Sequence, residues 1–120
     1  MTTWQILHNS KVWVQHVEVA SSMFARMRGL IGRRELPAGH GLLIENCGSI
    51  HTIGMRFPID VVFLDRDWRV RRICRHVPPG RLMVWCGWLG LRALEVASGW
   101  LPLDGVEVGA KMEWQEASEQ

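Results

Sequence analysis

The sequence contains no tyrosine, three cysteines, and little lysine among its basic residues. Its seven tryptophans supply large apolar surfaces instead, and each buried indole N–H needs a partner or water. The cysteines at 47, 74 and 86 are odd in number and widely spaced, so we expect no closed disulfide framework. This pattern is typical of a reducing compartment, and we predict a cytoplasmic protein.

Long apolar runs are also absent. The most apolar stretch, residues 82–91, has about half of the roughly 20 residues that a membrane-spanning helix requires. Residues 1–13 show no basic region followed by an apolar one, so we predict no secretory signal. We therefore expect no membrane span.

The net charge of +2 is too small to indicate nucleic-acid binding by itself, but the charges are unevenly placed. Residues 66–81 contain six arginines and one acidic residue, whereas 113–120 is acidic. Arginine favours bidentate contacts with carboxylate or phosphate groups. Nucleic-acid binding through the strand Arg66–Arg75 is therefore one hypothesis. Arginines along a strand more often form its solvated face, so we consider nucleic acid an unlikely partner.

The length suits a single domain over residues 1–120, without repeats or linkers. Alternating apolar residues bounded by turn residues predict seven short strands. These strands are expected at 4–8, 11–20, 41–46, 59–65, 68–77, 91–99 and 106–114. The first two form a predicted hairpin around Asn9-Ser10. In the fifth, Val70 and Ile73 are three residues apart, and a β-bulge near Arg71-Arg72 would turn both toward the core.

Residues 21–32 have a helical period, with Ser21 or Ser22 as a cap and Gly32 as a terminator. The predicted fold is mainly β (α+β). We expect a compact β-sandwich or partly closed barrel of about seven short strands, with one N-terminal helix packed on it.

Three ordered blocks, residues 28–44, 50–70 and 93–99, resemble the small bacterial and archaeal proteins catalogued as domain of unknown function 192. The resemblance covers about 12–112 and leaves an acidic tail, 113–120. It implies a compact, mainly β domain with a helix, but no activity and no catalytic residues. Trp68 stands where such proteins usually have glycine in a D-x-D-G turn, which disfavours a tight hairpin there.

Asp60 interrupts a strand that is apolar on both faces, so its carboxylate must be hydrogen-bonded, ion-paired or protonated. We favour a structural role, in which it binds backbone N–H groups of the preceding loop or pairs with Arg28 or Arg56. Glu95 interrupts another apolar stripe in the same way. Two independent structural acids are the simpler interpretation, but a carboxylate pair could also serve acid–base chemistry.

His51 and Thr52 lie between Gly48 and Gly54, where the backbone can turn sharply or approach a ligand. The imidazole could bind an anion, move a proton or simply fix the loop. Cys47 is four residues before His51, but the sequence offers no second close pair for a zinc ion. We therefore expect neither a metal nor a cofactor.

The apolar segment 82–91 could close one end of the core, or form a contact with a protein partner or a second copy. Our preferred hypothesis is a noncatalytic binding module for a small polar or anionic ligand, or for a peptide segment. The alternative is a small hydrolase or lyase that uses Asp60, Glu95 and His51 as acid and base. The candidate ligand-binding residues are His51, Thr52, Arg56, Asp60, Glu95 and Arg28, with Trp85 and Trp88 at the rim.

Overall fold

The described part of the chain contains nine strands. The structure is a computed structural model that describes residues 3–20, 30–45, 47, 49–81, 84–85, 92–100 and 107–116. Its strands are β1 (Trp4–His8), β2 (Lys11–Ala20), β3 (His40–Glu45), β4 (Ser49–Ile50), β5 (Ile59–Leu64), β6 (Val70–Val77), β7 (Val84–Trp85), β8 (Arg92–Ala97) and β9 (Glu113–Glu116). Six of the seven predicted strands match closely, and the seventh begins later, at Glu113. The two-residue strands β4 and β7 were not predicted.

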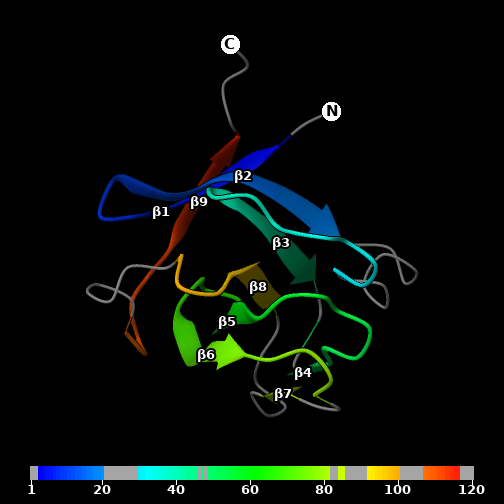
Figure 1. Ribbon diagram of the computed structural model, residues 1–120. Helices are drawn as coiled ribbons and strands as arrows, with labels where there is room; N and C mark the ends of the chain where they lie inside the picture. The colour runs from blue at the N-terminus through cyan, green and yellow to red at the C-terminus, as the bar shows by residue number, and fades with distance from the viewer. Residues whose placement is uncertain are drawn as a thin grey trace.

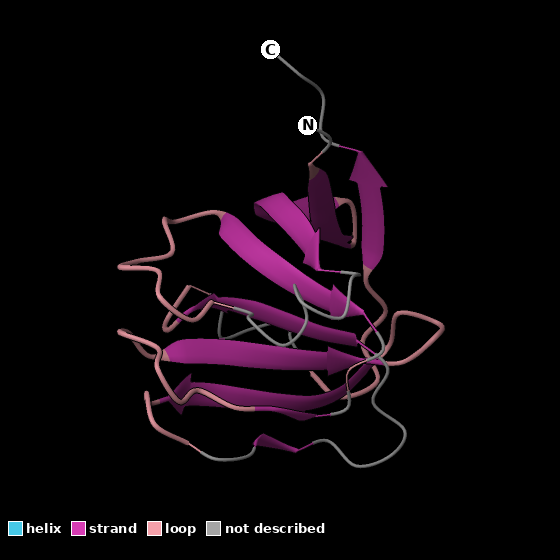
Figure 2. Ribbon diagram, turned by 90° about the vertical axis from the view of Figure 1, so that its right-hand side faces the viewer, coloured by secondary structure: helices cyan, strands magenta, loops and turns pink. Residues whose placement is uncertain are grey.

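Seven of these strands make one sheet in the order β6-β5-β8-β3-β2-β1-β9, and β4 pairs with β7 in a separate ribbon. Figure 1 shows the sheet descending from β9, β1 and β2 to β6, with the ribbon below it. The predicted hairpin of β1 and β2 is confirmed, while β2 and β3 pair in parallel. Figure 2 shows the same side-by-side arrangement of strands after a turn of 90° about the vertical axis.

The sheet is not a closed barrel. Its terminal strands are β6 and β9, and just before them Arg69 and Lys111 form a single β-bridge. Beside this bridge the Val70 N–H donates to the Ala110 carbonyl at 2.9 Å. The mainly β class is thus confirmed, as one open seven-stranded sheet rather than a sandwich of two comparable sheets.

The predicted N-terminal helix is not supported. Most of its range, residues 21–29, lies outside the described residues, and 30–32 form a turn with Gly32 at a φ of 85°. No helix occurs within the ranges that the structure describes. Leu30, within that turn, is buried.

The sheet separates two apolar cores. On β5, Val61 and Phe63 pack into one core, while Val62 and Leu64 pack into the other. All six residues of β5 are buried, which confirms the expectation of an interior strand. The first core also contains Ile50, whereas the partly buried tryptophans Trp4, Trp13 and Trp68 pack against the second.

Strand β6 contains two irregularities in its pairing with β5. Phe63 pairs with Arg72 and Leu64 with Val70, so Arg71 is the extra residue, which confirms the predicted bulge. The second was not predicted. Ile59 pairs with Val77 and Val61 with Cys74, so residues 75 and 76 together face Asp60.

The turn between β5 and β6 is tight despite Trp68, so the expectation from the missing glycine was wrong. Trp68 adopts a left-handed φ of 62°, and its N–H donates to the Asp65 carbonyl at 3.0 Å. The Asp65 carboxylate accepts the backbone N–H groups of Asp67 and Arg69 at 2.9 and 3.0 Å. These bonds hold the turn around a residue that is not glycine.

Candidate functional site

An open cleft of about 430 Å³ follows strand β6. Its lining comprises seven consecutive residues, 72–78, together with Arg81 and Val84 across the turn. Four of the lining residues are basic, Arg72, Arg75, His76 and Arg81, and none is acidic. The cleft therefore has the electrostatic character of an anion site. We call it the β6 cleft.

Thr52 fixes the turn that forms one end of the β6 cleft. Its side chain is fully buried, donates to the Pro78 carbonyl at 2.7 Å and accepts the Arg81 N–H at 2.8 Å. Its backbone N–H donates to the Arg81 carbonyl, and its carbonyl accepts the Gly80 N–H, both at 2.9 Å. A hydroxyl is needed here because it both donates and accepts. Thr52 therefore positions the cleft wall through the backbone.

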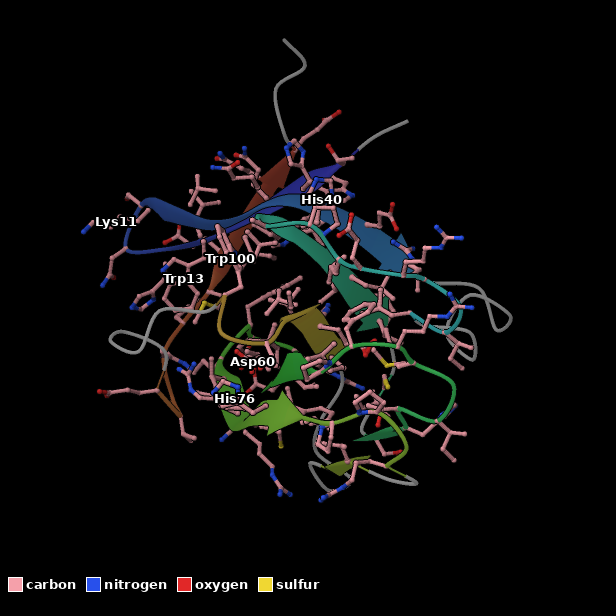
Figure 3. The ribbon with its side chains drawn as sticks, in the orientation of Figure 1. Lys11, Trp13, His40, Asp60, His76 and Trp100 are labelled. Carbon is pink, nitrogen blue, oxygen red and sulfur yellow. The ribbon has the colours of Figure 1, made fainter. Side chains whose placement is uncertain are left out.

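Asp60 fixes the other irregular part of β6. Its fully buried carboxylate accepts the His76 N–H at 2.8 Å and the Gly99 N–H at 3.1 Å. The Arg75 guanidinium lies 3.9 Å away. Figure 3 shows Asp60 and His76 next to each other at this end of the sheet. The expected structural role is supported, although one donor lies in β6 and the other follows β8, instead of both lying in the preceding loop.

The strain in β6 is concentrated at His76, which has a left-handed φ of 53°. Such a φ is unfavourable for a residue with a side chain and persists where surrounding contacts hold it. Its N–H is held by Asp60, and its Nδ1 is hydrogen-bonded to the Ser98 hydroxyl. The exposed His76 ring is thereby fixed at the cleft.

Glu95 does not join Asp60. On the paired strands, Glu95 lies opposite Val61 and Asp60 lies opposite Val96, so the two acidic side chains point to opposite faces of the sheet. The acid–base pair required by the hydrolase or lyase hypothesis is therefore not formed. Asp60 satisfies two backbone donors, whereas the Glu95 Oε1 has no hydrogen-bond partner among the described residues.

Burial raises the pKa of Glu95 to about 8, although the positive charge of Arg33 acts in the opposite direction. Arg33 forms its own ion pair with Glu18 at 2.7 Å. The Glu95 carboxyl is accordingly protonated at neutral pH, as the cost of a buried charge requires. It acts as a neutral polar group within an apolar face.

The remaining candidates do not converge on one cavity. His51 and Arg56 are exposed, and neither lines the β6 cleft. Arg28 and Trp88 lie outside the described residues, as does most of 82–91. Trp85 belongs to β7 and pairs with Ser49 through the backbone, but its side chain is not described.

The basic residues of the β6 cleft were recognised in the sequence only as part of a charged stretch. Two of them, Arg72 and Arg75, belong to the strand proposed for nucleic-acid binding, while neither His76 nor Arg81 was a candidate ligand-binding residue. The signal that could have located them is the change from the strand to Pro78-Pro79-Gly80, which turns Arg81 back toward β6. The contact of this turn with Thr52 joins residues 29 positions apart, which a linear pattern does not show.

Within the described ranges, no group of three or more histidine, cysteine or acidic residues could hold a metal ion. The same ranges contain no helix with the length and apolar character needed to cross a membrane.

The sequence profile of the DUF192 family, described as "Uncharacterized ACR", matches residues 5–114. A search of curated proteins found no match. The fold is similar to a protein of unknown function from Novosphingobium aromaticivorans, with a TM-score of 0.80 and 23% identity over 93% of this chain and 84% of that one.

A second similar structure comes from Sinorhizobium meliloti and is described, provisionally, as a transcription regulator. It has a TM-score of 0.81 and 22% identity over 94% of this chain and 92% of that one. At these identities, both comparisons show a shared fold.

Proposed function

Because the chain belongs to the DUF192 family, whose description names no activity, we propose a function from its own geometry: noncatalytic binding of an anionic ligand in the β6 cleft. The observation that carries this proposal is the lining, with four basic side chains and no acidic one. Guanidinium groups bind carboxylate and phosphate through directional, charge-assisted hydrogen bonds.

The surrounding bonds support a preorganised site. Thr52 holds the backbone around Arg81, and Asp60 holds the backbone of His76. Neither polar side chain lines the cleft itself, so ligand binding does not compete with these bonds. A cleft whose walls are already fixed loses less conformational entropy on binding.

Calorimetric titration with phosphate, citrate and a polyglutamate oligomer tests the proposal. We expect wild-type binding to weaken about three- to tenfold in Arg81→Ala, since a charge-assisted contact is lost while the Arg81 backbone bond to Thr52 remains. Arg66→Ala is the matched control because it removes an exposed arginine that does not line the cleft. Equal weakening in both variants, or no binding of any anion, would contradict the proposal.

Nucleic acid is a second candidate anion. Arg72 and Arg75 in the cleft belong to the basic strand, and the Sinorhizobium relative is described in terms of transcription. Binding of a single-stranded oligonucleotide should then fall steeply with salt, because phosphate contacts release counterions. Tighter binding of an oligonucleotide than of polyglutamate at equal ionic strength would favour this candidate.

A further inference from the structure

We propose that the ligand of the β6 cleft is an extended acidic peptide segment, which adds to β6 as the next strand of the main sheet. This inference rests on the proposed anion-binding function and specifies both the ligand class and its mode of binding. It follows from the position of β6, the course of the cleft and the placement of charge.

β6 is a terminal strand of the seven-stranded sheet. It pairs with β5 on one side, and beyond the contacts of Val70 no strand of the described residues pairs with its other side. A terminal strand is a template for an added strand, because part of its backbone faces away from the sheet. Many proteins use such an edge to bind extended peptides.

The cleft has the course that this mode requires. It is lined by residues 72–78 in unbroken succession, so it runs along the strand rather than across it. At about 3.3 Å per residue, the extended part from Arg72 to Arg75 alone covers roughly 10 Å, and the cleft continues to Pro78. A single phosphate or carboxylate would occupy only part of that length, whereas an extended peptide would follow it.

The regular part of this edge is short. It lies between the bulge at Arg71 and the irregularity at residues 75 and 76, and comprises Arg72, Ile73 and Cys74. Ile73 and Cys74 are partly buried and pack against the two different cores. Only a few backbone hydrogen bonds fit here, so charge must contribute much of the affinity.

The charges select the peptide. Arg72 and Arg75 lie on the strand, with Arg75 also 3.9 Å from the buried Asp60 carboxylate, and Arg81 lies across the turn. A basic segment would be repelled, while glutamates or aspartates at alternate positions would meet these groups. The same charges that admit an acidic strand discourage unspecific pairing of neutral strands.

The test uses a fluorescent nine-residue peptide of alternating glutamate and valine, measured by anisotropy. Two further versions carry N-methyl groups on alternate backbone amides. One version, or frame, has them on the odd-numbered residues and the other has them on the even-numbered residues. They retain the charges but cannot donate hydrogen bonds from one edge. We expect the frame that faces β6 to bind at least about tenfold more weakly and the other frame to bind like the unmodified peptide.

Protein variants supply the second arm. Arg81→Ala and Arg72→Glu should weaken peptide binding, and Arg66→Ala should leave it unchanged. A lysine–valine peptide should not bind. These expectations use the folded chain throughout, and circular dichroism confirms that each variant retains its strands.

Different failures have different meanings. If both N-methylated frames bind as well as the unmodified peptide, strand addition is wrong while anion binding stands. If an oligonucleotide displaces the peptide at far lower concentration, or if sedimentation shows that a second copy of the chain occupies the edge, the peptide assignment is wrong. If neither the peptide nor any small anion binds, both proposals fall.

Discussion

At the scale of single residues, the two buried acids show how similar sequence contexts lead to different chemistry. The Asp60 carboxylate accepts hydrogen bonds from two backbone N–H groups. Glu95 lies against apolar neighbours, and its Oε1 has no such donor among the described residues. Sequence indicated that both are buried, but it could not indicate the donors, because His76 and Gly99 are 16 and 39 positions from Asp60.

Glu95→Gln should change the pH dependence of stability. The folded-state pKa of Glu95 is raised from 4.5 to about 8, so the folded chain keeps a proton that the unfolded chain releases. Between these pH values the wild type should lose up to about 1.4 kcal/mol of stability per pH unit from this group. Gln does not titrate, so urea unfolding should show the variant gaining on the wild type from pH 5 to 8.

The control for this prediction is Glu18→Gln, since Glu18 is an exposed partner of Arg33. Its removal also takes away a contact of Arg33 but should not reproduce the pH trend. Parallel stability curves for wild type and Glu95→Gln over this range would show that Glu95 is not protonated in the fold.

At the scale of elements, the β5–β6 turn illustrates a conflict between backbone and side-chain preferences. Trp68 accepts a left-handed φ of 62°. Its ring stacks on the Trp114 ring with 5.5 Å between the ring centroids. The Arg92 guanidinium carbon lies over the Trp68 ring, 4.3 Å from its centroid. Such contacts contribute about 0.5–1.5 kcal/mol for an aromatic pair and a similar amount for a cation over a ring.

Comparing Trp68→Gly with Trp68→Ala separates the two contributions. Both variants lose the ring, but only glycine relieves the left-handed backbone. We expect Trp68→Gly to be the more stable of the two by about 1 kcal/mol, because the left-handed conformation is costly for a residue with a Cβ. Chemical denaturation measures the difference.

Ordinarily glycine is the less stable choice at a position with right-handed or extended backbone. The same pair of substitutions at the exposed Val12 in β2 provides that reference, where alanine should be favoured. The opposite order at Trp68 would mean that the turn changes its conformation when the ring is removed.

At the scale of the whole molecule, the apolar alternation of the strands was sufficient to predict a mainly β chain and most strand positions. It could not predict that β2 and β3 pair in parallel, or that β8 lies between β5 and β3. These relations join distant segments of the chain. The alternation of apolar residues within a strand is the same whichever strand pairs with it. The β6 cleft depends on such relations, so its residues were visible as charges but not as a site.

The two cores should unfold together, because both are built on the same strands. Leu42 and Leu43 are adjacent on β3 and pack into different cores. Truncating either to alanine should remove about 2–5 kcal/mol of stability. Trp4, Trp13 and Trp68 pack against the second core, so tryptophan fluorescence includes a signal from that core, while far-ultraviolet circular dichroism reports the whole sheet.

We expect the two signals to give one common midpoint in Leu42→Ala, although the substitution is in the core without those tryptophans. Val108→Ala, at a side chain that is 66% exposed, should change stability by less than about 0.5 kcal/mol. Separate midpoints in Leu42→Ala would show that the cores are independent.

The pairing of β1 with β9 has a consequence for the order of folding. Gln5 and Gln115 are hydrogen-bonded across these strands although 110 positions separate them. During synthesis, β1 and β2 can form their hairpin early, but the sheet cannot gain its last strand until residues 113–116 have left the ribosome. Closing so large a loop is entropically unfavourable, and folds dominated by such distant contacts form slowly, on the order of milliseconds to seconds. Until then the outer side of β1 stays unpaired, so the nascent chain is most prone to misassociate just before its final strand arrives.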